Sequence, residues 1–140
     1  MKIFFAGSIR GGRVMLPVYI QIVELLKKKG HTVVSEHVAS DTLEEIEAKI
    51  TDEEIFHNDI GYIDESECLV ADVTIPSVGV GYEICYAISK NKLVLCVYME
   101  DANVSAMVRG NRRVVTVQYK NMGELEYIFT LNLPEQLKIK

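Results

Sequence analysis

Short apolar runs alternate with amphipathic stretches along the chain, a pattern typical of strands and helices arranged in βαβ units. The run Lys92–Tyr98 is almost wholly apolar, as expected for a central strand of a parallel sheet that is covered on both faces. The same kind of pattern predicts five strands in all: Lys2–Ala6, Thr32–Ser35, Glu67–Val73, Lys92–Tyr98 and Arg113–Tyr119. The hydrophobic pattern therefore predicts an α/β fold.

The amphipathic stretches between these runs predict the helices. Val14–Lys29 carries apolar residues at helical spacing, and Gly30 supplies a stop signal. Thr51 to Glu54 fits a capping box that opens a helix running to about Asp64. Further helices are predicted at Asp41–Ile50, Tyr82–Lys90 and Met122–Leu131, with a single turn within Ser105–Gly110.

Five strands with interleaved helices predict a Rossmann/flavodoxin-like, doubly wound parallel sheet in the order 2-1-3-4-5, with helices on both faces. Such sheets bind ligands at the carboxyl ends of the strands, where the strand order reverses. This point lies between the first and third strands, so the expected site is formed by Gly7–Arg13 and Thr74–Glu83. No linker, repeat or low-complexity segment interrupts the chain, and we expect a single domain, residues 1–140.

The loop after the first strand has the composition of an anion-binding turn. Glycines let the backbone approach a ligand closely, and the following helix directs its positive dipole end toward the loop. The loop lacks the Gly-Lys-Ser/Thr ending of a nucleoside-triphosphate site, so hydrolysis of triphosphates is not predicted. A tight turn without a ligand is the alternative. The candidate substrate-binding residues are Gly7, Ser8, Ile9, Arg10, Gly11, Gly12 and Arg13.

The loop after the third strand repeats this chemistry and adds a carboxylate. The Ser77 hydroxyl and the Gly79 N–H are suited to hold a phosphate oxygen. We expect Glu83 in the first turn of the next helix, where the helix dipole favours the ionised form that a nucleophile needs. The alternative is that Glu83 only stabilises the helix N-terminus.

Acid–base chemistry needs a second carboxylate. The candidates are Asp59, Asp64 and Asp72, although each is also explained as a cap or a solvated charge. His37 follows the second strand, and we expect it at the edge of the pocket unless it is purely structural.

Composition and charge exclude several other functions. With 140 residues, 49% of them hydrophobic, and a net charge of −5, the chain offers a packed core but no basic stripe for a long nucleic acid. Cys68, Cys85 and Cys96 form no CxxC pair, so we expect buried free thiols, no metal site and no cofactor. Lys2–Ala6 is too short for a signal-peptide core or a membrane span, and a cytoplasmic location is expected.

Four separate segments, in their order along the chain, resemble the 2′-deoxynucleoside 5′-monophosphate N-glycosidases of the nucleoside 2-deoxyribosyltransferase superfamily. They are Gly7–Arg13, Glu36–Ala39, Pro76–Glu83 and Ser105–Gly110. The resemblance spans nearly the whole chain. It implies a Rossmann-like fold and an enzyme that releases a free base and deoxyribose 5-phosphate.

The resemblance also implies roles for individual residues. Glu83 is expected to attack the anomeric carbon and form a covalent glycosyl-enzyme intermediate, while Asp59 helps to protonate the leaving base. Ser8, Arg10, Ser77 and Gly79 correspond to positions around the phosphate and the sugar. A homodimer is implied, in which Ser105 reaches the phosphate in the neighbouring active site. His37 and Met107 complete the expected substrate contacts.

One residue departs from the family pattern. The family usually carries a Tyr where this chain has Phe4, and the resemblance places that hydroxyl near the 2′ edge of the sugar. Its absence predicts weakened discrimination against a 2′-hydroxyl, and similar enzymes that act on ribonucleotides such as CMP carry Phe. A ribonucleotide N-glycosidase is therefore one alternative. A nucleoside 2-deoxyribosyltransferase, which exchanges bases, and a nucleotide sensor without catalysis are the other two.

Overall fold

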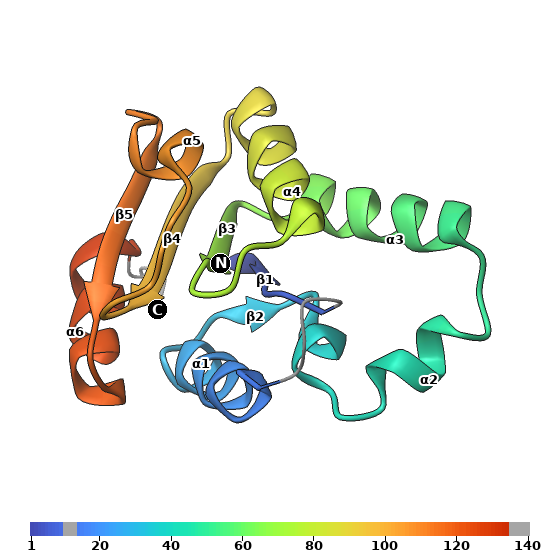
Figure 1. Cartoon of the computed structure of the whole chain (residues 1–140), viewed down its shortest axis with the longest axis horizontal. Helices are drawn as coiled ribbons and strands as arrows, with labels where there is room; N and C mark the ends of the chain where they lie inside the picture. The colour runs from blue at the N-terminus through green and yellow to red at the C-terminus, as the bar shows by residue number, and fades with distance from the viewer. Residues whose placement is uncertain (10–13, 135–140) are drawn as a thin grey trace, which may run out of the picture.

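The computed structural model describes residues 1–9 and 14–134 (Figure 1). Five strands form one sheet in the order β2-β1-β3-β4-β5, and every neighbouring pair is parallel. The predicted doubly wound sheet and its strand order are confirmed. The strands are β1 Lys2–Ala6, β2 Thr32–Val33, β3 Cys68–Asp72, β4 Leu93–Met99 and β5 Val114–Tyr119.

The helices follow the predicted order, with differences at some boundaries. The predicted capping box is present: the Thr51 side chain accepts from the Glu54 N–H, and the Glu54 side chain accepts from the Thr51 N–H. The acidic stretch Asp41–Ile50 forms only a five-residue helix, preceded by a 3-10 turn. The bounds are α1 Leu16–Lys28, η1 Glu36–Ala39, α2 Leu43–Glu47, α3 Asp52–Glu65, α4 Val78–Ser89, α5 Ala106–Arg109 and α6 Met122–Asn132.

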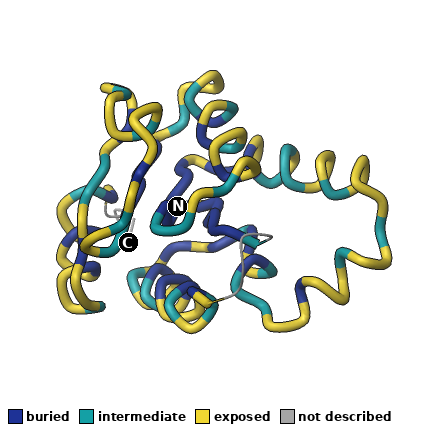
Figure 2. The backbone as a smooth tube through the Cα atoms, in the orientation of Figure 1, coloured by how far each residue is buried: buried dark blue, intermediate teal, exposed yellow. Residues whose placement is uncertain are grey.

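Helices cover both faces of the sheet, as predicted. Alternate residues of β1 point to opposite faces, so Phe5 joins a core cluster with Tyr19 of α1 and Phe129 of α6. Phe4 joins the other cluster, with Ile63 of α3 and Ile84 of α4. Figure 2 shows long buried runs in the central strands β1, β3 and β4, whereas β5 at the edge is buried only at its ends. Both apolar layers fix the carboxyl edge of the sheet in place.

The start of the loop after β1 is fixed by α1. A side chain at Gly7 would place its Cβ 2.8 Å from the ring of Tyr19, so only glycine fits at this position. The Ser8 N–H donates to the Tyr19 hydroxyl at 3.0 Å. The predicted substrate contacts Arg10 to Arg13 lie outside the described residues.

A buried polar network holds the end of β3. The Asp72 carboxylate is fully buried and accepts from the Tyr119 hydroxyl at 2.6 Å and from the Thr74 N–H at 2.9 Å. Thr74 in turn accepts from the Met99 N–H at 3.0 Å. Burial raises the pKa of Asp72. These bonds tie the loop that leads into α4 to the ends of β4 and β5.

The sequence predicts that all three cysteines are buried. Cys68 and Cys96 are buried free thiols, but Cys85 is exposed, and the expectation for Cys85 was wrong. Its apolar neighbours in sequence lie on the inner face of α4, whereas Cys85 lies on the outer face.

Among the described residues, no helix is long and apolar enough to cross a membrane.

Candidate active site

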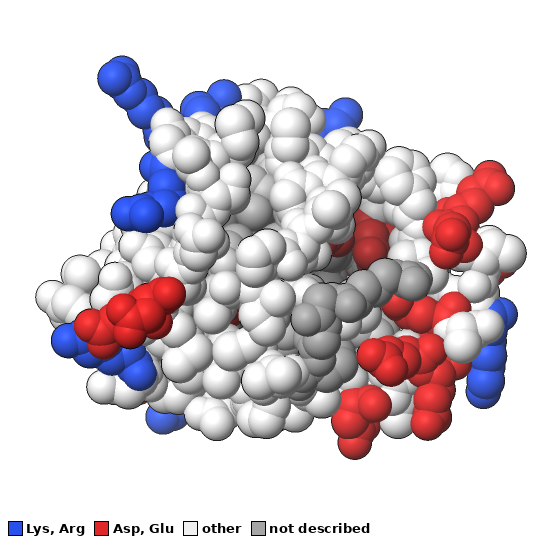
Figure 3. Space-filling view, in the orientation of Figure 1, with Lys and Arg blue, Asp and Glu red and all other residues white. Residues whose placement is uncertain are grey.

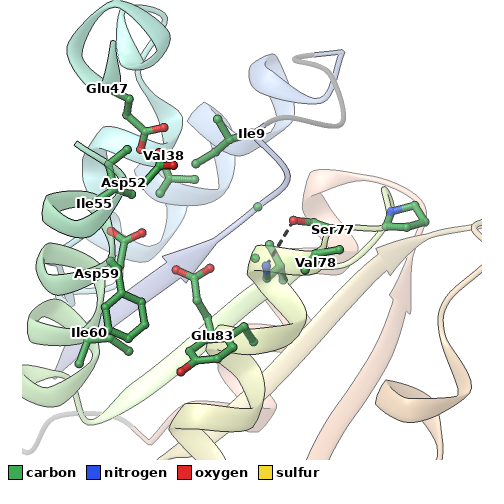
Figure 4. Close-up of a pocket in the computed structure, with 16 residues that line it drawn as sticks. Ile9, Val38, Glu47, Asp52, Ile55, Asp59, Ile60, Ser77, Val78 and Glu83 are labelled. Atoms are coloured by element: carbon green, nitrogen blue, oxygen red, sulfur yellow. Dashed lines mark hydrogen bonds between the residues drawn. The ribbon is translucent and has the colours of Figure 1, made fainter. Parts of the chain in front are cut away.

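A cavity of about 720 Å³ opens at the carboxyl ends of β1 and β3 (Figure 4). The start of the β1 loop, helix α3 and the N-terminal half of α4 form its walls. Its volume is within the range of roughly 300–1,000 Å³ that is usual for small-molecule sites. The cavity lies where the reversal of strand order predicts a ligand site.

Helix α4 begins earlier than the sequence suggests. Ser77 is the N-cap, and its hydroxyl accepts from the Val80 N–H at 3.3 Å. The prediction of a loop that runs through Gly81 was wrong. Ser77 caps α4, and both Gly79 and Gly81 lie within the helix. Glu83 consequently lies in the second turn and not, as expected, in the first.

The acidity of Glu83 also differs from the expectation. Burial, the negative charge of Asp59 and that of Glu47, in this order of importance, raise the pKa of Glu83 to about 8. A helix N-terminus favours a carboxylate mainly within the first turn, and Glu83 lies beyond it. The free carboxyl group is therefore mostly protonated at neutral pH.

Asp59 is the second carboxylate that the structure brings into the cavity. It extends from α3, and Figure 4 shows its side chain and that of Glu83 directed into the same space. The Nε2 atom of His37 lies 3.6 Å from a carboxylate oxygen of Asp59. His37 therefore borders the site through Asp59.

The other two candidate carboxylates have structural partners and do not line the cavity. Asp64 is exposed and accepts from the Tyr86 hydroxyl at 2.6 Å. Asp72 belongs to the buried network at the end of β3. Of the three candidates, only Asp59 has the geometry for chemistry with Glu83.

Four more of the predicted substrate contacts line the cavity, namely Gly7, Ile9, Ser77 and Gly79. Ser8 and Phe4 are fully buried, and neither lines it. Phe4 lies in the core cluster that supports α4 from below. Its influence on the sugar stays a prediction.

Ser105 and Met107 lie away from the cavity of this chain. Ser105 is exposed and caps α5 by accepting from the Met107 N–H at 3.1 Å. Met107 is 85% exposed. Their predicted contact with a neighbouring active site stays untested in a single chain.

One face of α3 forms a wall of the cavity that the sequence analysis missed. Apart from Asp59, no residue of this face was expected in the site. The signal was present, because the lining residues follow the i, i+3, i+4, i+7, i+8 spacing of one helix face. They are Asp52, Ile55, Phe56, Asp59 and Ile60.

Aromatic and acidic side chains complete the walls of the cavity. The rings of Phe56 on α3 and Tyr82 on α4 meet edge to face, with centroids 6.0 Å apart. Glu47, at the end of α2, adds a further carboxylate. Among residues 1–9 and 14–134, no group of three His, Cys, Asp or Glu side chains is placed to hold a metal ion.

Comparisons with known proteins identify the family of the chain. The family model described as nucleoside 2-deoxyribosyltransferase matches residues 3–122. A provisionally named 2′-deoxynucleoside 5′-phosphate N-hydrolase 1 of Methanococcoides burtonii is 51% identical over 111 residues, which cover 79% of this chain and 91% of the relative. The 5-hydroxymethyl-dUMP N-hydrolase of Danio rerio is 42% identical over 113 residues, which cover 79% of this chain and 78% of the relative.

A solved structure has the same fold. The Clostridium botulinum CMP N-glycosidase BcmB aligns with a TM-score of 0.70 and 20% identity, over 95% of this chain and 100% of that structure. The family model spans most of the sheet together with α3 and α4, which form the cavity. The chain therefore belongs to the nucleoside 2-deoxyribosyltransferase family.

Proposed function

We propose that the protein hydrolyses the N-glycosidic bond of nucleoside 5′-monophosphates, deoxy or ribo, and releases the free base and the sugar 5-phosphate. The observation that carries the proposal is the pair Glu83 and Asp59, which extend from two helices into one cavity. Relatives named as nucleotide N-hydrolases support the substrate class.

Glu83 is the nucleophile of the proposed reaction. Its ionised carboxylate attacks the anomeric carbon as the bond to the base breaks, and a glycosyl ester forms. Water then attacks the same carbon and regenerates the carboxylate. The transition state resembles an oxocarbenium ion, which a nearby negative charge stabilises.

Asp59 supplies the acid chemistry. It donates a proton to the base as the base departs, and it then accepts a proton from the attacking water. Such catalysis is worth roughly 10²- to 10⁴-fold in rate. His37, 3.6 Å from Asp59, orients this carboxyl group.

The phosphate binds at the start of α4. Ser77 and Gly79 line this end of the cavity, where N–H groups and the positive helix end favour an anion. Arg10 is the added cation that the family resemblance implies. Holding the phosphate there fixes the sugar against Glu83.

The proposal includes a homodimer in the cytoplasm. Ser105 and the exposed Met107 lie on the surface at α5, accessible to a second copy of the chain. In that dimer, Ser105 contacts the phosphate bound by the partner subunit.

A release assay tests the function. The purified protein is incubated with a panel of deoxy- and ribonucleoside monophosphates, and the free bases are separated by chromatography. Glu83→Gln is expected to lower the rate of release at least about 10³-fold. Glu126→Gln makes the same change on the exposed side of α6 and should keep the wild-type rate. Release by Glu83→Gln near the wild-type rate contradicts the mechanism.

The same assay separates the alternatives. A transferase exchanges bases when a second free base is added, and it yields no free sugar phosphate. A sensor binds a monophosphate without releasing any base. Hydrolysis predicts equal amounts of free base and sugar phosphate.

A further inference from the structure

The end of the cavity that is formed by α2 and the start of α3 is acidic. Glu47, the last residue of α2, and Asp52, the first residue of α3, line it. Figure 4 shows both side chains on the α2 and α3 side of the cavity, across from Ser77 on the α4 side. Figure 3 shows acidic side chains gathered at this side of the molecule. A ligand that spans the cavity therefore meets carboxylates at this end.

The proposed function decides which part of the ligand lies there. With the phosphate at Ser77 and the anomeric carbon at Glu83, the base extends toward α2. Its faces lie among the apolar side chains of Val38, Ile55 and Phe56, which suit a flat ring. The outer edge of the base then faces Glu47.

A carboxylate accepts hydrogen bonds and donates none when it is ionised. An amino group on the base donates a hydrogen bond to the carboxylate, whereas a carbonyl oxygen at the same place cannot donate one and is repelled by the negative charge. The two oxygens offer about four acceptor positions, so a base N–H adds to the contact that Glu47 makes within the protein.

We infer that Glu47 is a specificity-determining residue that selects bases carrying an exocyclic amino group over bases with a carbonyl oxygen at that position. This inference rests on the proposed function. Glu47 is half-buried and lines the same cavity as Glu83. A binding site built around a hydrogen bond rejects ligands that cannot make it, because a carbonyl oxygen of the base then faces the carboxylate oxygen in place of a donor.

The ratio of kcat/KM for dCMP and dUMP tests the inference. Both bases have one ring of the same shape, with an amino group on cytosine where uracil has a carbonyl oxygen. We expect the wild-type protein to prefer dCMP by at least about tenfold. Glu47→Gln should lower this ratio at least about fivefold, since an amide both donates and accepts. CMP and UMP are measured in parallel.

Glu45→Gln is the matched control. It changes the same residue type on the same helix, but Glu45 is exposed and does not line the cavity. Its ratio for dCMP and dUMP should equal that of the wild type.

The outcomes separate the two proposals. Base release by the wild type with no preference, or with a preference for dUMP, overturns the inference and leaves the hydrolase intact. An unchanged ratio in Glu47→Gln does the same. No release from any of the four nucleotides overturns the proposed function, and the inference with it.

Discussion

Asp59 on α3 and Glu83 on α4 point into one cavity, where their negative charges oppose each other. Burial is the main reason that the pKa of Glu83 rises to about 8, and the charge of Asp59 is the second. Two carboxylates in one enclosed site ionise together only at a cost. This relationship makes the proposed chemistry depend on pH.

The pH profile of the wild type is the first prediction. The proposed step needs one proton on the pair of carboxylates: Asp59 donates it while the ionised Glu83 attacks. The pair loses this proton above about pH 8, so kcat/KM should fall nearly tenfold per pH unit there. The substrate phosphate, with a second pKa near 6, is almost fully ionised above about pH 7 and does not produce this fall. A flat profile between pH 6.5 and 9 would contradict the assignment.

Replacing Asp59 should move that profile. Asp59→Asn removes both the charge that opposes ionisation of Glu83 and the proton that the pair shares, so kcat/KM should rise as Glu83 ionises at a pH below 8 and should not fall above pH 8. The maximum of kcat/KM should be lower than in the wild type by about 10²-fold or more, because the acid that protonates the base is lost. Asp64→Asn changes a carboxylate of the same helix outside the cavity, and it should leave the fall above about pH 8 in place.

Glu83→Gln should make the folded protein more stable while it removes the activity. The pKa of the Glu83 carboxyl group is about 8 in the folded state and has its ordinary value of 4.5 in the unfolded chain. The folded state therefore binds the proton more tightly. Ionisation therefore opposes folding, and stability falls as the pH rises from 4.5 toward 8. Glutamine carries no charge, so the variant should gain about 1–3 kcal/mol at pH 8.

Urea unfolding at two pH values measures this effect. The gain of Glu83→Gln in the free energy of unfolding should be present at pH 8 and close to zero at pH 4. An equal gain at both pH values would indicate a packing effect and not the ionisation of Glu83.

The network at the end of β3 should contribute to stability. Tyr119→Phe removes the 2.6 Å hydrogen bond to the fully buried Asp72 carboxylate, and we expect a loss of about 1–3 kcal/mol in the free energy of unfolding. Tyr127→Phe removes the hydroxyl of a tyrosine that is 64% exposed, and it should change the stability by less than about 0.5 kcal/mol. Equal effects of the two changes would argue against the network.

The sugar preference follows from Phe4. Without the tyrosine hydroxyl that the family resemblance predicts at this position, we expect weak discrimination between matched deoxy- and ribonucleotides. The ratio of their kcat/KM values should be below about 10²-fold, the level typical of a pocket that does not hydrogen-bond the distinguishing group. A deoxy preference on the order of 10³-fold would contradict the prediction.

The sheet could be predicted from the sequence because its signals are local. Each strand is an apolar run, and the carboxyl-edge position of both loops follows from the topology. The start of α4 could not be predicted, because Gly79 and Gly81 have the composition of a loop. The Ser77 cap and the packing of Val80 and Ile84 outweigh that tendency.

The candidate site could be predicted only in part, for a related reason. Glu83 and Asp59 follow from their segments and from the family resemblance. Glu47 and Phe56 enter the cavity only because α2 and α3 fold over the sheet edge, an arrangement that is not local in sequence. The acidity of Glu83 likewise depends on burial and on charges from two other helices.

Helix α3 has a single fully buried side chain, Ile63, near its C-terminal end. The half of the helix that carries Ile55, Phe56 and Asp59 stands over the cavity. Substitutions in that half cost the fold little, since almost no core packing depends on it. The substrate range of this enzyme can therefore diverge, by natural drift or by design, while the scaffold stays intact.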